Sequence, residues 1–263
     1  MVTAHFRFYD DLADFLPRER RGRDFQSPCA RDATVKHMIE ALGVPHTEVE
    51  LVLVNGESSG FDYLLRDGDR VAVYPSFGQL DVGGLQRLRS WPAGRAHFVA
   101  DAHLGGLARL LRMAGYDTLY DNAYRDEEIE RIAREEERVL LTRDRELLKR
   151  RSVELGCYLH ALDPARQLRE LFARLRLGPG MRPFSLCLHC NLPLRAVAKE
   201  DVLDRLPPQV AESQSAFTTC DGCGRVFWKG SHHARMCGLL AGVAGMNAAP
   251  ADVKLPPTPD SHA

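Results

Sequence analysis

The sequence lacks the long apolar run of a membrane-spanning helix, because no stretch approaches the roughly 18 apolar residues that a bilayer requires. Its first residues, MVTAHFRFYDDLADFL, carry early acids and no basic stretch followed by an apolar core, so we expect no secretion signal. An excess of one charge is also missing, since the formal net charge is −1. We therefore expect a cytoplasmic protein with no membrane partner, and overall charge identifies no other partner.

What is present is an ordinary globular composition. The 263 residues are 44% hydrophobic and 27% charged, which excludes collagen-like and fully disordered chains. This length suits one large domain or a few small ones. The tail is rich in Ala, Gly and Pro, so we expect it to be mostly disordered. By pattern, the chain divides into a first domain, a linker, two further domains and this tail, at residues 1–80, 81–96, 97–178, 179–235 and 236–263.

Residues 1–80 have the alternation of a small α+β domain. A half-buried strand is expected at AHFRFY, a helix at ATVKHMIEALGV, and a hairpin turn at Asn55–Gly56 after the strand VELVLV. The stretches VNGE and LRDGDRVAVYP resemble the ubiquitin-like β-grasp family, which includes the small sulfur carriers. Because Gly83–Gly84 lies inside the chain and offers no terminal carboxylate, we expect a protein partner or a scaffolding role rather than sulfur transfer.

Residues 97–178 alternate short apolar strands with helices, which predicts a parallel α/β sheet. The expected strands are HFVAD, DTLYD, RVLLTRD and CYLHALD, and each ends in an aspartate: Asp101, Asp121, Asp144 and Asp163. The carboxyl ends of strands in an open α/β sheet face the crevice where ligands bind. Oxygen ligands of this kind select Mg²⁺ or Mn²⁺, and such ions promote phosphodiester hydrolysis.

A structural alternative stays open for these acids, because aspartate directly after a strand is a common N-cap of the next helix. For Asp101 and Asp144 together we favour the functional interpretation, since both follow apolar strands and both have arginine nearby. Basic residues of the helix after Asp144, including Arg145 and Lys149, are candidates for contact with a phosphate backbone. Their alternative is a solvated helix face.

Two CxxC pairs, Cys187–Cys190 and Cys220–Cys223, follow the predicted sheet. Four thiolates at this spacing suit a structural, tetrahedral Zn²⁺ site, and the presence of two pairs disfavours a redox motif. The segment RVFWKGSHHARM comes next and mixes aromatic with basic residues, so Trp228 and Lys229 are candidates for base stacking and phosphate contact. The alternative is that its aromatic residues pack a domain too small to have a large core.

Four stretches resemble the ribonuclease family named for the carboxy-terminal domain of the Mut-seven exonuclease: FVADAHLGGLARLLRMAGYDTLYD, DEEIERIAREEERVLLTRDRELLKRR, PFSLCLHCNLPL and CDGCGRVFWKGSHHARM. That family has a PIN-like fold, which many metal-dependent RNases and toxin nucleases share. It commonly carries a zinc ribbon after the nuclease domain and often a ubiquitin-like domain before it. The resemblance therefore implies a multidomain α+β and α/β chain: a ubiquitin-like β-grasp domain, a PIN-like parallel α/β sheet and a zinc ribbon.

The resemblance also implies roles for single acids. Asp101 matches the first acidic position of the family, and Asp144 matches the acid after the third strand. Asp126 and Glu127 open the intervening helix, where PIN-like folds often place an acid, and Glu127 is the preferred one of the two. With Asp121 and Asp163 as further candidates, these are the expected catalytic residues. The expected ligands of Mg²⁺ or Mn²⁺ among them are Asp101, Glu127 and Asp144.

Three arginines match family positions that serve RNA phosphate or fix the carboxylates: Arg109, Arg112 and Arg143. A structural salt bridge is their alternative. We therefore expect a metal-dependent ribonuclease that hydrolyses RNA phosphodiester bonds, with tRNA or ribosomal RNA as substrate and with a toxin-like role as one form of that activity. The alternative is a non-catalytic adaptor for RNA or the ribosome. In the adaptor the acids are helix caps, whereas an enzyme needs its carboxylates close together.

Overall fold

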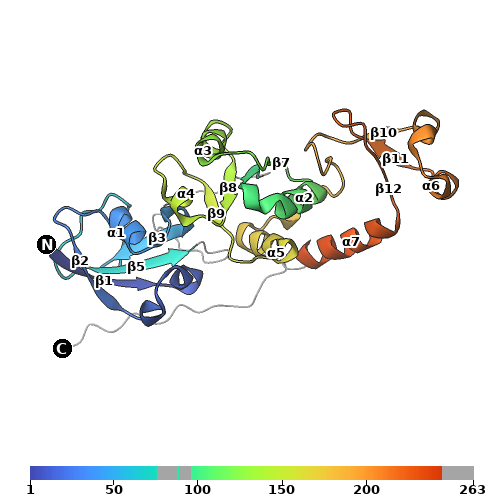
Figure 1. The fold of residues 1–263 in the computed structure, drawn as a ribbon. Coiled ribbons are helices and arrows are strands. Elements are labelled where there is room, and N and C mark those ends of the chain that lie inside the picture. The colour runs from blue at the N-terminus through green and yellow to red at the C-terminus, as the bar shows by residue number, and fades with distance from the viewer. Residues whose placement is uncertain (76–87, 89–95, 245–263) are drawn as a thin grey trace.

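The computed structural model describes residues 1–75, 88 and 96–244. Figure 1 shows three sheets that follow one another along the chain: five strands at the N-terminus, four in the middle and three toward the C-terminus. The expected linker lies almost entirely outside the described residues, and so does Gly83–Gly84. No helix within the described ranges has both the length and the apolar character needed to cross a membrane.

The N-terminal sheet has the strand order β2-β1-β5-β3-β4, with β1 parallel to β5 and its other pairs antiparallel. The helix α1 (Val35–Ala41) begins after Thr34, whose hydroxyl accepts the His37 N–H at 3.2 Å, and it buries Val35 and Ile39 against the sheet. The expected Asn55–Gly56 turn joins β3 to β4, and both residues have positive φ. The strands are β1 (Val2–Phe8), β2 (Phe25–Cys29), β3 (Val49–Val54), β4 (Glu57–Ser58) and β5 (Arg70–Pro75).

The middle sheet is parallel throughout, with the order β7-β6-β8-β9, as the alternation of strands and helices predicts. Because successive strand residues face opposite sides, Phe98 and Leu141 pack against α2 and α5, while Val99 and Leu140 pack against α3 and α4. Both faces are therefore covered, and only the strand ends remain open. The elements are β6 (Phe98–Ala100), α2 (Gly105–Ala114), β7 (Thr118–Leu119), α3 (Asp126–Glu135), β8 (Val139–Thr142), α4 (Arg145–Lys149), β9 (Gly156–Tyr158) and α5 (Pro164–Leu175).

The C-terminal sheet is small and antiparallel, with the order β10-β11-β12. Its buried core consists of Val202, Leu206 and Phe217, and the short helix α6 (Pro208–Ser213) adds Val210 and Ala211 at the margin. So small a core rarely holds a fold without a further staple. The strands are β10 (Arg195–Val197), β11 (Phe217–Thr219) and β12 (Val226–Trp228).

The helix α7 (Ser231–Ala244) corrects one expectation, because residues 236–244 were predicted as part of a disordered tail. Leu240 and Val243 are buried in the core of the middle domain, and Met236 and Leu239 pack beside them. Apolar residues at this spacing form one stripe of a helix, and the stripe covers α5. The Ala and Gly content obscured the stripe, and residues 245–263 lie outside the described part of the chain.

The N-terminal domain is seated on the outer edge of β9. The Glu48 carboxylate accepts the Tyr158 N–H at 2.7 Å and pairs with the guanidinium of Arg174 on α5. The ring of Phe15 meets those of Tyr158 and His160 at centroid distances of 5.0 and 5.3 Å. Because β9 is an edge strand, Glu48 takes a hydrogen-bonding position that another strand would otherwise fill.

Candidate functional site

The carboxyl ends of β6 and β8 bring together two of the predicted acids, Asp101 and Asp144. The side chain that joins them is Thr142, which is fully buried at the end of β8. Its hydroxyl donates to Asp101 Oδ2 at 2.7 Å and accepts the Asp144 N–H at 2.9 Å. Asp101 and Asp144 are thus held next to one another on adjacent parallel strands, at the edge of the sheet where such folds bind ligands.

The two acids differ in their local roles. Asp101 precedes a short 3₁₀ turn but makes no side-chain capping bond, so its carboxylate is fixed by Thr142 rather than by a helix. Asp144 is the N-cap of α4, where Oδ1 accepts the N–H groups of Glu146 at 2.8 Å and Leu147 at 3.4 Å. The capping interpretation therefore holds for Asp144, but it engages one carboxylate oxygen and leaves the second for another role.

Asp121 and Asp163 serve local turns. Asp121 accepts the Ala123 N–H at 2.9 Å, and Asp163 caps α5 by accepting the Arg166 N–H at 3.0 Å. Both residues are exposed. These bonds fit the structural alternative for both acids.

Asp126 and Glu127 lie in the first turn of α3 and face Arg150 instead of the other acids. Asp126 Oδ2 lies 3.0 Å from the Arg150 guanidinium, and Glu127 Oε1 lies 3.9 Å from it. The Glu127 side chain is 79% exposed. Within the described residues, no three carboxylates approach closely enough to form a metal-binding group, so the expected set of Asp101, Glu127 and Asp144 is not assembled.

The predicted RNA-binding residues divide into exposed and engaged side chains. Arg109 and Lys229 are exposed, Arg143 is exposed but donates to the Leu159 carbonyl at 3.2 Å, and Trp228 is half-buried beside the small core. Arg145 donates to the Phe15 carbonyl at 3.1 Å and lies over the Phe15 ring, so it belongs to the domain contact. The structural alternative also fits Lys149, which pairs with Glu146 at 2.7 Å.

Arg112 is buried, at 4% exposure, and has a structural role. Its guanidinium donates to the carbonyls of Thr118, Leu188 and His189 at 2.9, 3.1 and 2.8 Å. All three acceptors are backbone oxygens, and two of them belong to the first cysteine loop. Arg112 is thus withdrawn from solvent, which is a correction of its expected contact with RNA phosphate.

The first cysteine loop is held against β7 by a polar network that the sequence did not indicate. Asn191 accepts the Thr118 N–H at 3.0 Å and donates to Asp117 at 2.5 Å. Burial alone would raise the pKa of Asp117, but hydrogen bonds from Arg138 and Asn191 lower the pKa below its usual range. Asp117 therefore stays ionised and ties the middle sheet to the cysteine loop.

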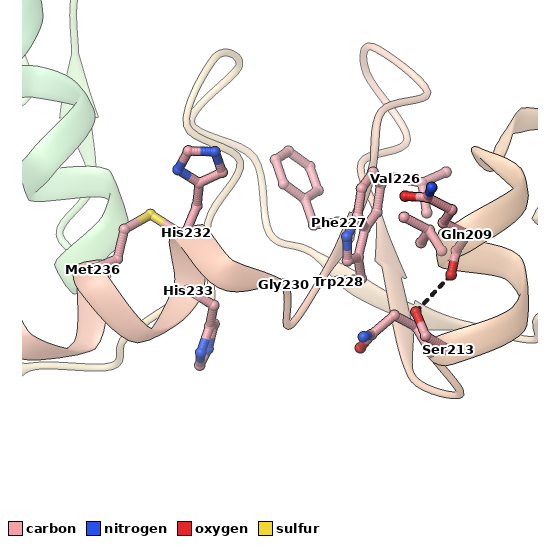
Figure 2. A pocket seen from close by; sticks show the side chains of 11 residues that line it. Gln209, Ser213, Val226, Phe227, Trp228, Gly230, His232, His233 and Met236 are labelled. Atoms are coloured by element: carbon pink, nitrogen blue, oxygen red, sulfur yellow. Dashed lines mark hydrogen bonds between the residues drawn. The ribbon is translucent and has the colours of Figure 1, made fainter.

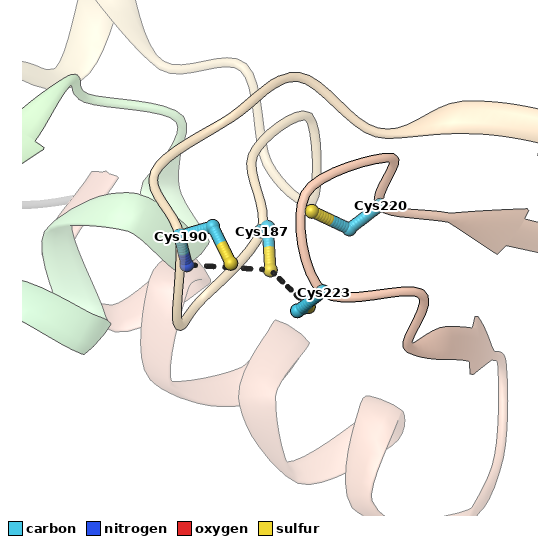
Figure 3. A group of neighbouring side chains, drawn as sticks. All are labelled: Cys187, Cys190, Cys220 and Cys223. Atoms are coloured by element: carbon cyan, nitrogen blue, oxygen red, sulfur yellow. Dashed lines mark hydrogen bonds between the residues drawn. The ribbon is translucent and has the colours of Figure 1, made fainter.

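Four cysteine sulfurs meet between the middle and C-terminal domains (Figure 3). The ligand atoms of Cys187, Cys190, Cys220 and Cys223 all lie within 4.8 Å of one another. Cys187 Sγ and Cys223 Sγ are 3.7 Å apart, close to the separation of about 3.8 Å expected for two thiolates in a tetrahedron with Zn–S bonds of about 2.3 Å. The backbone N–H of Arg225 lowers the pKa of the Cys223 thiol, whereas burial raises the pKa of Cys187 and the hydrogen bond to Cys223 raises that of Cys190. The cluster therefore fits a four-coordinate metal ion.

Comparison with family models identifies the family of the chain. The family model of the Mut7-C RNAse domain matches residues 96–240, and the model of the Mut7-C ubiquitin domain matches residues 1–81. The chain belongs to the Mut7-C RNAse domain family. The Mut7-C match covers the parallel sheet, the cysteine cluster and most of α7, so these parts form one family unit.

Among solved structures, two of small archaeal modifier protein 1 from Haloferax volcanii are similar to part of the chain. They are 24% and 23% identical, cover 28% and 29% of this chain and 98% of the modifier, and have a TM-score of 0.24. No curated protein matches the chain. The β-grasp assignment rests on the strand order above and on the family match to residues 1–81.

Proposed function

We propose that this Mut7-C protein is a metal-dependent ribonuclease that hydrolyses RNA phosphodiester bonds at the carboxyl edge of a PIN-like parallel sheet. The observation that carries the proposal is the Asp101–Thr142–Asp144 arrangement at the ends of β6 and β8. Its place within the matched Mut7-C RNAse region supports RNA as the substrate. Transfer RNA and ribosomal RNA remain the proposed substrate classes, and a toxin-like role in limiting translation is one form of this activity.

Asp101 and Asp144 are the residues that would hold the Mg²⁺ or Mn²⁺ ion. When bound, such an ion stabilises negative charge on the phosphate and lowers the pKa of a coordinated water. Thr142 donates to one oxygen of Asp101 and thereby fixes the direction of the other oxygen. Arg143 lies between Thr142 and Asp144 in sequence and is exposed. Its Nε donates to the Leu159 carbonyl, and its two terminal nitrogens would supply positive charge for a phosphate at this edge.

Two carboxylates leave room for a third ligand, and Glu127 is the remaining candidate from the first turn of α3. Its contact with Arg150 is long and its side chain is exposed, so reorientation breaks no buried interaction. We propose that the four cysteines bind Zn²⁺ in a closed, structural ribbon, separate from this site. The β-grasp domain is proposed to contact a protein partner in addition to its seat on β9.

A specific observation favours a second function, that of a non-catalytic RNA- or ribosome-binding adaptor. Asp144 and Asp163 both cap helices, as the adaptor interpretation requires. The experiment is cleavage of unstructured RNA and of tRNA by the wild type and by the Asp101→Asn/Asp144→Asn double variant, with Mg²⁺, Mn²⁺ or EDTA and with zinc content measured. If the protein is a nuclease, the wild type cleaves RNA when metal is added, whereas the double variant and the wild type in EDTA do not. RNA binding without cleavage by either protein contradicts the nuclease and supports the adaptor.

A further inference from the structure

A pocket of about 500 Å³ lies between α6, β12 and the first turns of α7, and none of the strand-end acids lines it (Figure 2). This volume falls within the range of about 300–1,000 Å³ typical of small-ligand sites. Its walls consist of apolar, aromatic, amide and imidazole groups and include no carboxylate. They come from α6, β12, α7 and the loop between β12 and α7, and they include Gln209, Phe227, Trp228, His232 and Met236.

Two neighbouring aromatic residues of β12, Phe227 and Trp228, line the pocket, and their side chains leave opposite faces of the strand. Trp228 packs one side of its indole against the small core, whereas Phe227 belongs to no buried cluster and faces the start of α7 (Figure 2). Both rings are half-buried, so each keeps accessible surface. At Gly230, an added Cβ would lie only 3.2 Å from the Trp228 Nε1 atom, so the absence of a side chain there keeps the indole edge open.

The charged residues close to the pocket in sequence are mostly basic. Between Asp221 and Asp252 the sequence contains no acidic residue, but it contains Arg225, Lys229 and Arg235. All three basic residues are exposed. Glu212 of α6 is the acidic residue next in sequence to the pocket-lining Ser213, and it is exposed as well. A neutral aromatic pocket with three exposed basic residues and one exposed acid close to it in sequence suits a ligand that combines a flat ring with negative charge.

We propose that this pocket binds one unstacked nucleobase of single-stranded RNA, with the adjoining phosphate toward Lys229. The proposal rests on the proposed function for its substrate class and adds a second point of RNA contact. Phe227 supplies the stacking surface, Trp228 contributes its indole edge, and the amide of Gln209 offers both a donor and an acceptor to a base edge. Because the pocket lies in the small C-terminal domain, it governs RNA affinity rather than the cleavage step.

The test measures the affinity of a fluorescent oligouridylate for the full chain in the Asp101→Asn/Asp144→Asn background, where cleavage is blocked without a chelator. Phe227→Leu keeps apolar volume but removes the ring, and Phe227→Tyr keeps the ring as a matched control. We expect Phe227→Leu to weaken binding at least about fivefold, the low end for one stacked base. Phe227→Tyr should bind within about twofold of the parent, and both variants should retain zinc.

Unchanged affinity of a zinc-loaded Phe227→Leu protein overturns the pocket assignment. A change of oligomeric state on this substitution, without loss of affinity for RNA, also overturns it and identifies a second copy of the chain as the occupant. Failure of the pocket proposal can be distinguished from failure of the proposed catalysis. Loss of RNA binding in Phe227→Leu supports the pocket even if the wild type cleaves no RNA. If the wild type cleaves RNA but Phe227→Leu binds RNA normally, the nuclease proposal stands and the pocket proposal is wrong.

Discussion

At the residue scale, the hydroxyl of Thr142 decides how the two candidate acids are placed. It donates to Asp101 and accepts from the backbone of Asp144, so a single buried group orients both strand ends. A hydrogen bond to a charged group contributes about 1.5–3 kcal/mol, more than a neutral one. Thr142 is therefore a positioning residue whose effect passes through the two carboxylates.

Thr142→Val should reduce the rate of RNA cleavage about 10- to 100-fold, because it removes the hydroxyl and leaves the Asp101 carboxylate without its donor. Single-turnover cleavage at saturating metal measures this effect. Thr142→Ser retains the hydroxyl and is the control, with expected activity within about threefold of wild type. Equal loss in both variants would mean that the methyl packing of Thr142 matters and its hydroxyl does not.

At the scale of elements, the first cysteine loop is attached to the parallel sheet as well as to the small sheet. Arg112 and Asn191 make this attachment through buried hydrogen bonds to backbone groups. Among the described residues, the buried apolar cluster of the C-terminal domain consists of Val202, Leu206 and Phe217. We infer that metal binding stabilises the small sheet. The first cysteine loop stays packed against β7 without the metal, because the hydrogen bonds of Arg112 and Asn191 hold it there.

Cys220→Ser should abolish zinc binding and unfold β10–β12 while the middle sheet stays folded. A structural Zn²⁺ site contributes about 10–16 kcal/mol of binding free energy to folding, far more than this small core supplies. Metal analysis together with hydrogen exchange of the β11 and β6 amides measures the two outcomes separately. The control is the same substitution at Cys237, which lies on α7 and outside the cysteine cluster. Cys237→Ser should retain zinc. Protection of β11 in a zinc-free Cys220→Ser protein would contradict this account.

Much of the fold at this scale could be predicted from the sequence, because the signals are local. The Asn55–Gly56 turn, the alternating strand β1 and the strand-helix alternation after residue 97 each depend on neighbouring residues. The stripe of α7 was also present in the sequence, at Met236, Leu239, Leu240 and Val243, but its Ala- and Gly-rich composition favoured a disordered tail.

The site was only partly predictable, for a physical reason. The pattern predicts that Asp101 and Asp144 end parallel strands, but it does not predict that β6 and β8 pair, since β7 lies between them in sequence. The attraction of Asp126 and Glu127 to Arg150 depends on how α3 packs beside the segment after α4, which no local signal encodes. The burial of Arg112 likewise depends on a loop that lies far along the chain.

At the scale of the whole molecule, the β-grasp domain is a fixed part of the structure rather than a separate module. Glu48 is almost completely buried, and it holds both the Tyr158 N–H and the Arg174 guanidinium. Asp11 lies on the same guanidinium at 3.8 Å, and burial raises the pKa of Asp11 although Arg174 opposes the shift. The edge strand β9 thus depends on the N-terminal domain for its outer hydrogen bond.

Glu48→Gln should destabilise the domain contact by about 3–5 kcal/mol, because it leaves Arg174 without its buried partner. We expect the wild type to unfold in one thermal transition and Glu48→Gln to unfold in two, with faster hydrogen exchange at Tyr158. The control is Arg7→Ala, which removes an exposed pair with Asp24 at 3.7 Å and should change stability by less than about 1 kcal/mol. If Glu48→Gln behaves like Arg7→Ala, the two domains are joined by other contacts.

The most direct measurement of the central claim compares Asp144→Asn with Asp163→Asn in metal-dependent cleavage of unstructured RNA. Both aspartates cap the helix that follows a parallel strand, and asparagine caps a helix about as well as aspartate, so neither change should disturb the fold. Only Asp144 is joined through Thr142 to Asp101. We predict that Asp144→Asn abolishes cleavage and Asp163→Asn retains it. Full cleavage by Asp144→Asn, with zinc present, would contradict a catalytic site at the ends of β6 and β8.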